Sequence, residues 1–507
     1  MNSRNIFLRK IVYLVAIGVL LGLLYLFGHP STADTPNEKG SPGGILAQYR
    51  NRHGSGLSQT QLGQIDPTSE TIKLATFGLR GVAALVLWEK ANDYKMKEDW
   101  ANFAATLNQI IKVEPHFISV WIHQAWNMSY NVSVEFDDYH ERYRWVIKGI
   151  NYLKQGIDYN KFEPRLLWET GWMISQKIGR SDDHKYYRRL FKADDEFNES
   201  RPLALRDNWL VGKEWFLEAI KLADSIGKGI GGKSPLIYLS DPPMSQMNYS
   251  EAIETEGTFG EVARRAWKTA GDEWFQYGSI PIPSTYGVDI YLNDKDKEEE
   301  QAKKLVAQLD ALQPGLRDEI REKKHQQLTP EQRDAYDTPF EKRTSEQVQL
   351  GYEADERMRV THEDVARQIK GANHAKAKEL AEKATEHEDA ATYISRYRDT
   401  VNFLYWRLRA QVEQTEEAIN ARKFIYQGDR AYRDGDPTAA RTDYDQGFAL
   451  WRQVLDKFPA FIEDEITGSD LMDFVKQYER ILKQLDEPFP ANFPLQDVVD
   501  RYGKKPG

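Results

Sequence analysis

Apolar residues recur at the three- and four-residue spacing of an α-helix through most of the first half of the chain. The clearest runs are Leu79, Val82, Val86 and Ala91; Trp121, Ala125 and Met128; and Trp168, Trp172 and Ser175. No alternation of apolar and polar residues longer than a few positions, the pattern of a half-buried strand, occurs before residue 235. Eleven of the thirteen tryptophans lie between Trp88 and Trp274, which places the packed body there. The spacing therefore predicts an all-α fold.

A second kind of apolar run stands near the N-terminus. Ile11–Phe27 is seventeen residues long and carries no charge, and Arg4, Arg9 and Lys10 precede it. At 1.5 Å per residue, this run just covers a hydrocarbon layer of roughly 30 Å. We therefore expect residues 1–28 to be a cytoplasmic n-region and a transmembrane helix that contacts the lipid bilayer through residues 11–27. Basic residues next to a transmembrane helix stay on the cytoplasmic side. The chain would therefore be a single-pass protein of the inner (cytoplasmic) membrane, with its N-terminus in the cytoplasm and its bulk extracytoplasmic.

Two alternatives to this anchor stay open. Ser31-Thr32-Ala33 offers small residues for cleavage of a signal peptide, although the apolar run exceeds the usual 7–15 residues. A buried soluble helix would show a polar face, which the run lacks. The next segment, residues 29–68, is polar and rich in Gly, Pro, Ser and Asn, so it predicts a flexible linker that buries little apolar surface.

Composition narrows the classes of function. The chain has no cysteine, which excludes disulfides, thiolate zinc sites, cysteine-ligated iron–sulfur clusters and a cysteine nucleophile. Its 68 basic and 78 acidic residues give a net charge of −10, whereas a nucleic-acid-binding protein needs a basic surface. We expect no nucleic-acid partner, no cofactor and no metal.

Two segments, residues 69–200 and 422–507, resemble tetratricopeptide (TPR) repeats. Pro115 and Pro164 each end one helical run and start the next, and Pro459 recurs in this role near the C-terminus. Small and aromatic residues match the repeat pattern at Ala91, Tyr94 and Leu107, and again at Gly428, Ala440, Tyr444 and Gly447. The period is longer than the usual 34 residues, so the resemblance implies elongated α-hairpin repeats, an α-solenoid, followed by a C-terminal TPR-like hairpin and a loosely held tail.

A narrower resemblance covers the front of the chain. The segments that carry it are Phe77–Gly81, Trp88, Glu114–Phe117, Trp121, Gln124–Asn127, Pro235–Tyr238 and Asp241–Met244. Together they are similar to a group of membrane-anchored TPR-like proteins of planctomycetes and related bacteria. That group is uncharacterised, and some members are named as iron-responsive. The resemblance implies an anchored helical-repeat protein, and the lack of cysteine excludes an iron–sulfur sensor with thiolate ligands.

One segment matches a nucleotide-binding motif by its letters alone. Gly227–Ser234 has the pattern G-x-x-x-x-G-K-S, with Gly227, Gly232, Lys233 and Ser234 at the motif positions. A phosphate loop needs a strand before it and a helix after it. Here a helical run precedes the loop and Pro235 follows at once, so the pattern favours a helix C-cap and a turn within a helical extension, residues 201–293. The run from 236 to 239 is expected to be a short extended piece.

Residues 294–421 are dominated by Glu, Lys, Arg, Gln and Ala and predict a long charged helical arm, antiparallel or extended. Ile394, Val401 and Leu408 recur at seven, with Tyr397 and Leu404 offset by three. A short coiled coil, and with it a homodimer through the arm, is therefore the alternative. His362, His374 and His387 are spaced too widely for one metal and are expected on a solvated surface.

The best-supported function is a non-catalytic scaffold that binds other envelope proteins or peptides. Trp121, Tyr130, Trp168 and Trp172 are the candidate partner anchors, because aromatic side chains dominate binding at such surfaces. Packing in the core is the alternative for the same four residues. The alternative function is an enzyme, either an ATPase that uses Gly227–Ser234 or a cell-envelope hydrolase with an unrecognised carboxylate pair.

Overall fold

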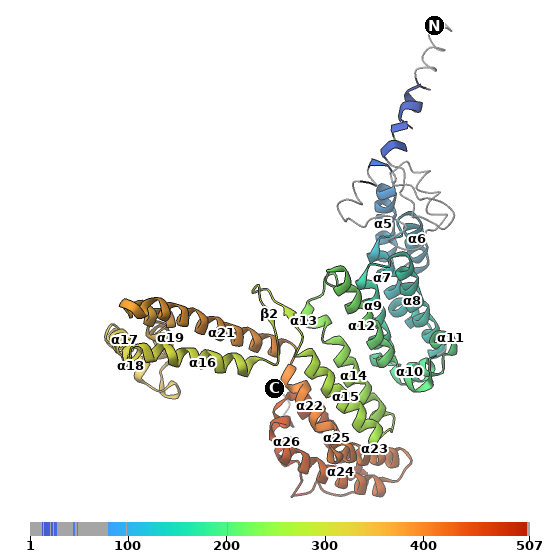
Figure 1. Ribbon diagram of the computed structural model, residues 1–507. Helices are drawn as coiled ribbons and strands as arrows, with labels where there is room; N and C mark the ends of the chain where they lie inside the picture. Colours follow the sequence, from blue (N-terminus) through green and yellow to red (C-terminus); the bar gives the residue numbers. More distant parts are fainter. Residues whose placement is uncertain are drawn as a thin grey trace. The chain divides into compact units, whose positions relative to one another are not determined.

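The computed structural model describes residues 80–97, 99–199 and 201–503, together with a few residues between 13 and 48. Apart from one small two-stranded hairpin, the regular elements of these described ranges are helices (Figure 1). The all-α prediction is therefore confirmed. The chain divides into two compact units. The first holds the residues up to Leu190 with Lys221–Lys228, and the second holds Phe191–Ile220 with Gly229 onward.

The predicted anchor, residues 1–28, and the predicted linker, residues 29–68, lie mostly outside the described residues. Within the part of the chain that the structure describes, no helix combines the length and the apolar character needed to cross a bilayer.

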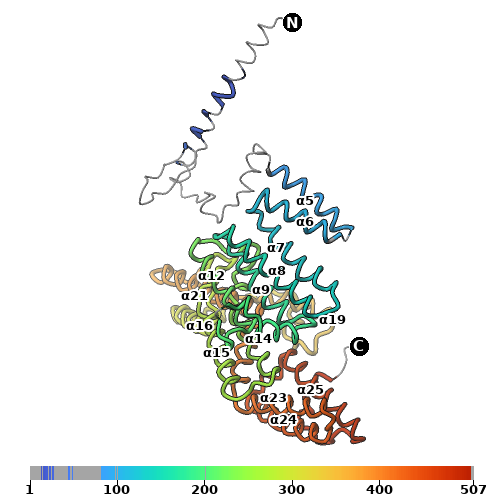
Figure 2. The backbone as a smooth tube through the Cα atoms, turned by 90° about the vertical axis from the view of Figure 1, so that its right-hand side faces the viewer, coloured from blue at the N-terminus to red at the C-terminus, as the bar shows by residue number. Residues whose placement is uncertain are grey.

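The first unit consists of helix pairs joined by short connections. Helix α5 packs on α6, and α8 packs on both α7 and α9 (Figure 2). A π-helix, η1, continues α7 and leads through a 3₁₀ turn, η2, towards α8. The elements are α5 (Arg80–Met96), α6 (Trp100–Val113), α7 (Ile118–Trp126), η1 (Asn127–Val132), η2 (Ser133–Glu135), α8 (Tyr139–Tyr159), α9 (Pro164–Arg180) and α10 (His184–Ala193), which ends in the second unit.

Local sequence accounts for these boundaries and for the close packing of α7 on α8. Pro164 begins α9, and the Glu163 side chain before it accepts a hydrogen bond from a backbone N–H of the first turn. Gly156 of α8 lies against the Trp121 ring, and a Cβ at this glycine would stand 2.9 Å from the ring. Gly149 meets the Ala125 carbonyl oxygen in the same way, at 2.7 Å. The glycines of α8 thus make room for α7.

The second unit begins with a helical region centred on two tryptophans. Helices α14 and α15 pack together as a hairpin, and Trp267 and Trp274 of α15 are fully buried in its core. The run from 236 to 239 is not extended as predicted, because Pro235 starts a helical turn after an extended Ser234. The elements are α11 (Asp195–Asn198), η3 (Leu203–Leu205), α12 (Asn208–Ile226), α13 (Pro235–Tyr238), α14 (Asp241–Thr255), α15 (Glu261–Tyr277), β1 (Ile282–Pro283) and β2 (Asp289–Ile290). The end of α12, from Lys221, belongs to the first unit.

The arm is an intrachain hairpin of long helices with short helices at its tip (Figure 1). Helix α16 packs along α21, where Glu298 pairs with His387 and Leu309 joins a core with Leu380. The two helices therefore run antiparallel, and His387 is half-buried, with its side chain 35% exposed beside Glu298. The elements are α16 (Lys295–Leu312), α17 (Leu316–Gln326), α18 (Pro330–Asp337), η4 (Phe340–Lys342), α19 (Ser345–Met358), α20 (His362–Gln368), η5 (Gly371–Asn373) and α21 (His374–Thr400).

The alternative for the arm, a coiled-coil helix that carries the heptad spacing from Ile394 to Leu408, is not a continuous helix. Helix α21 ends at Thr400, and Asn402 takes a left-handed φ of 49° that separates it from the next helix. Ile394 is buried in the chain's own core, whereas Leu404 is 55% exposed. The apolar seam is therefore used within the chain, and it does not continue along one helix face.

The C-terminal helices enclose the largest core. Gly428 of α23 allows close approach of α24, since a Cβ there would lie 2.5 Å from the Tyr444 ring. The predicted loose tail is also wrong: Phe493 and Leu495 are buried, and Phe493 stacks against Tyr478. The elements are α22 (Phe403–Glu413), α23 (Glu416–Arg433), α24 (Pro437–Lys457), η6 (Pro459–Glu463), α25 (Glu465–Gln484) and α26 (Gln496–Tyr502).

Candidate functional site

Two of the four predicted partner anchors lie in the core of the first unit. Trp121 is 1% exposed, and its indole N–H donates a hydrogen bond to the Pro115 carbonyl at 2.9 Å. Trp168 is 4% exposed. Both side chains are therefore packing residues in this structure, as the alternative interpretation holds, and a partner could not contact them on the folded surface.

The other two predicted anchors belong to a half-exposed row of rings. Tyr130 and Trp172 are each partly buried, and their ring centroids are 6.3 Å apart. Trp126, which was not among the predicted anchors, stacks on Tyr130 with centroids 5.7 Å apart and planes 18° apart. We call these three side chains the aromatic strip. Of the tryptophans whose side-chain burial the structure describes, Trp126 is the one that stands exposed, at 41%.

A buried lysine lies beneath the aromatic strip. The Lys177 ammonium is 4.5 Å from the centre of the Tyr130 ring, within the range of a cation–π contact. Burial lowers the pKa of Lys177, and Asp183 partly opposes that shift. Burial also raises the pKa of Tyr130 to about 12, so its hydroxyl stays protonated at neutral pH. The aromatic strip therefore consists of uncharged rings, one of which packs against the buried Lys177 side chain.

The π-helix explains how the strip is positioned. A π-turn holds one more residue than an α-turn, and such insertions occur frequently at functional sites. Here η1 begins at Asn127, directly after the exposed Trp126. Gln124 is fully buried, and neither polar atom of its side-chain amide has a hydrogen-bond partner; the Asn127 amide nitrogen also lacks one. Buried amides are rarely left in this state, which marks the segment as unusual.

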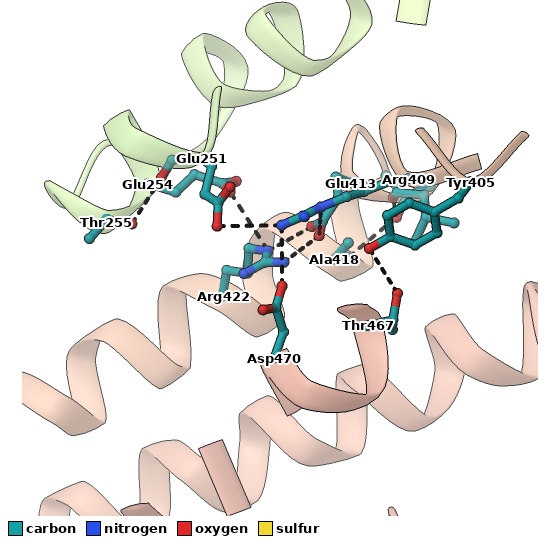
Figure 3. A network of polar contacts seen from close by, with 12 residues as sticks. Glu251, Glu254, Thr255, Tyr405, Arg409, Glu413, Ala418, Arg422, Thr467 and Asp470 are labelled. Carbon is teal, nitrogen blue, oxygen red and sulfur yellow. Dashed lines mark hydrogen bonds and ion pairs between the residues drawn. The ribbon is translucent and has the colours of Figure 1, made fainter. Parts of the chain in front are cut away.

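A second polar region lies inside the second unit, where four helices bring ionised side chains together (Figure 3). Arg422 of α23 binds the carboxylate of Glu413 through both Nε and Nη2, with Nε at 2.7 Å from Oε2. Arg409 of α22 pairs with Asp470 of α25 at 3.2 Å and with Glu251 of α14 at 3.4 Å. We call this group, together with Glu254, the ion network.

Tryptophans pack against both guanidinium groups of the ion network. Arg409 lies 5.9 Å from the centre of the Trp267 ring, and Arg422 lies 5.3 Å from that of Trp451. The carboxylates of Glu251 and Glu413 act against burial and raise the pKa of Arg409. Both arginines therefore stay charged, and the aromatic packing keeps them in place.

Glu254 differs from the other carboxylates of the network. Its side chain is almost fully buried, at 4% exposed. Its contact with Arg422, from Nε to Oε2, is long, at 3.7 Å. The Trp267 indole lies close enough to favour the charged form, but neither carboxylate oxygen accepts a hydrogen bond of good geometry. Burial, with Glu413 adding to it, raises the pKa of Glu254 to about 8. This carboxyl therefore keeps its proton to a higher pH than an ordinary glutamate does.

The glycine-rich loop does not have the surroundings of a phosphate loop. Helix α12 precedes it, and Gly227 ends that helix with a φ of 62° while the Lys228 N–H donates to the Ala223 carbonyl at 3.0 Å. Gly232, Lys233 and Ser234 follow in a turn that leads into the short α13. The backbone is the predicted helix C-cap, and the strand that a phosphate loop requires is replaced by a helix.

Comparison with known proteins identifies no relative of this chain. No family model matches the chain, and no curated protein or solved structure shows significant similarity to it.

Proposed function

We propose that this protein is a membrane-anchored, non-catalytic scaffold that binds a segment of another envelope protein on its aromatic strip. The observation that carries the proposal is the exposure of Trp126, 41%, within a stacked row of rings. Tryptophan and tyrosine supply large contact areas at a low cost in side-chain entropy and dominate the binding energy at protein interfaces.

The partner segment is expected to offer apolar or aromatic side chains. Tyr130 and Trp172 are half-buried and already fixed by contacts to their neighbours, so an incoming side chain would meet rigid rings. Edge-to-face or offset contacts with such rings stabilise a complex by about 0.5–1.5 kcal/mol each beyond the burial of area. A partner that packs on these two rings would also cover Trp126, the most exposed ring of the strip.

The TPR-like character and the anchor are part of the same proposal. Residues that match the repeat pattern lie where helices pack closely: Ala91 and Leu107 in the core shared by α5 and α6, and Gly428 against Tyr444 in the α23–α24 pair. Helical hairpins of this kind bury their inner faces on neighbouring hairpins and leave outer faces for partners. The apolar run at residues 11–27 would hold this surface beside the membrane.

A photo-crosslinking experiment tests the docking surface. The full chain is expressed in cells with p-benzoylphenylalanine in place of Trp126, and crosslinked products are identified by mass spectrometry. A matched control places the same group at Phe162, which is an exposed ring of the first unit outside the strip, at 50%. The proposal predicts a discrete polypeptide adduct at position 126 that is weak or missing at position 162.

Additional variants determine whether the strip acts as one surface. Tyr130→Ala and Trp172→Ala should each reduce the adduct at position 126, since both rings support the binding face. Products at position 126 that match those at position 162, or that contain lipid alone, would exclude a protein-docking strip.

A further inference from the structure

The ion network contains more carboxylates than cations. Four carboxylates, those of Glu251, Glu254, Glu413 and Asp470, face the two guanidinium groups of Arg409 and Arg422 (Figure 3). The carboxylates come from α14, α22 and α25, and the guanidinium groups come from α22 and α23. Helix α15 adds the uncharged indole of Trp267. With every group ionised, the network would carry two uncompensated negative charges.

The other three carboxylates make the closest contacts with the two guanidinium groups. Glu413, which is fully buried, takes both Nε and Nη2 of Arg422. Glu251 and Asp470 reach solvent, with side chains 46% and 38% exposed, and share Nη2 of Arg409. Solvent screens Glu251, whereas burial raises the pKa of Asp470 and the two arginines oppose that shift. Glu254 is almost fully buried and accepts no hydrogen bond of good geometry, either from Arg422 at 3.7 Å or from the nearby Trp267 indole, so it is the member that is least able to hold a negative charge.

We propose that Glu254 is the proton-binding site of a clamp that holds α14 against the C-terminal helices, closed when the carboxyl is protonated and loosened when it ionises. A neutral carboxyl group leaves Arg422 paired with Glu413 and removes one excess charge from the network. An ionised Glu254 places a fourth carboxylate next to the two ion-paired arginines, and no hydrogen bond of good geometry stabilises it.

The end of α14 contacts α23 at a second place, which provides a local reporter of opening. Gly257, just beyond α14, lies so close to Tyr426 of α23 that a Cβ there would be 2.7 Å from the tyrosine hydroxyl. Phe259 packs edge-on against the same ring, with centroids 5.5 Å apart. Separation of α14 from α23 would break these contacts and expose backbone amides in both segments.

The direction of the pH effect follows from the raised pKa of Glu254, about 8 against an ordinary value of 4.5. Between these values the closed form binds a proton that the open form does not hold. The closed form therefore has its full stability below the ordinary value and loses it as pH rises through about 8, by up to tenfold in the closed-to-open ratio per pH unit.

Hydrogen–deuterium exchange on the full chain in detergent, between pH 5 and pH 9, tests this proposal. Protection factors, corrected for intrinsic exchange rates, are compared in α14 and α23 for the wild type, Glu254→Gln and the control Glu416→Gln, which changes an exposed carboxylate of α23 outside the network. In the wild type and in the control, protection should fall at least tenfold from pH 6 to pH 8 and then level off. In Glu254→Gln it should stay flat, and should exceed that of the wild type at pH 9.

A second variant covers the case in which the glutamine amide destabilises the site by itself. Glu254→Met has a similar volume and no polar group, so it imitates the neutral carboxyl without needing a hydrogen bond. It should also remove the pH dependence. Loss of protection with rising pH that persists in both Glu254 variants, or a wild type whose α14 and α23 do not respond between pH 6 and pH 8, would overturn the proposal.

Discussion

The two polar regions both bury charged side chains, but they surround them differently. In the first unit, Lys177 lies beneath the Tyr130 ring, and the aromatic strip continues outward to the exposed Trp126. In the second unit, Arg409 and Arg422 are enclosed by carboxylates and tryptophans from several helices. The charge is covered by aromatic faces in one region and by opposite charges in the other.

This difference separates two roles. Rings that cover a cation still have one free face or edge, so the aromatic strip retains surface for a partner. The charged groups of the ion network pair with one another across α14, α22, α23 and α25, so they hold these helices together. We therefore expect changes in the ion network to affect stability and its pH dependence, and changes in the exposed part of the strip to affect binding.

Arg422→Ala should have the largest effect on stability. It leaves Glu413, which is fully buried, without its bidentate partner, and should lower the free energy of unfolding of the C-terminal helices by about 3–5 kcal/mol. The measurement is the urea dependence of hydrogen exchange in α23 and α24. The control Arg367→Ala breaks an exposed pair with Glu363 and should cost about 0–1 kcal/mol. Equal losses in the two variants would mean that the network is no stronger than a surface ion pair.

Gly156→Ala should have the next largest effect, in the first unit. The new methyl group would meet the Trp121 ring at 2.9 Å, and such overpacking costs about 1–3 kcal/mol, partly offset by the better helix propensity of alanine. Thermal unfolding followed by tryptophan fluorescence provides the measurement. Gly81→Ala is the matched control, because nothing lies within 4 Å of its Cβ position in α5. A Gly156 variant as stable as the Gly81 variant would show that α7 can move away from α8.

The sequence predicts the helices well and the two polar regions only in part. Trp121 and Ala125 show their burial through local spacing, because the period of an α-helix determines which side chains face the core. The ion network has no such signal: Arg409 and Glu413 have the spacing of an ordinary surface pair, and Glu254 and Asp470 join them only when distant helices pack.

The sequence predicts two of the three side chains of the aromatic strip and misses the third for a related reason. The spacing suggests Tyr130 and Trp172, but it gives no sign of the π-turn that begins at Asn127. That turn changes the helical phase after Trp126, so the stacking of Tyr130 on Trp126 could not be predicted from a regular period. The coiled-coil alternative for the arm fails for a similar reason, because Asn402 interrupts the helix with a left-handed φ.

The two regions should also respond to pH in opposite directions. Burial lowers the pKa of Lys177 below its ordinary 10.5, so the folded first unit binds fewer protons than the unfolded chain just below that value. Relative to Lys177→Met, the wild type should therefore gain stability as pH rises towards 10.5, whereas Glu254 causes a loss as pH rises through about 8.

Hydrogen exchange of α8 and α9 between pH 7 and pH 10 measures the Lys177 effect, with Lys148→Met as the control. Lys148 also lies over a ring, that of Trp145 at 4.3 Å, but it is exposed. The difference between the wild type and Lys177→Met should shrink with rising pH, while the control should show no such trend. A difference that grows with pH would reverse the assignment of burial as the cause.

Trp126→Ala should have the smallest effect on stability and the most specific effect on binding. The ring is 41% exposed and stacks on Tyr130, so its loss should lower the free energy of unfolding by only about 0.5–1.5 kcal/mol. Binding of the protein identified by crosslinking at this position should weaken at least tenfold, measured by co-purification with the full chain. Phe162→Ala removes an equally accessible ring from the same unit and should leave binding unchanged. If Trp126→Ala instead destabilised the first unit as strongly as a core substitution, the strip would be part of the packing, and the contrast between a binding surface and an internal ion network would no longer hold.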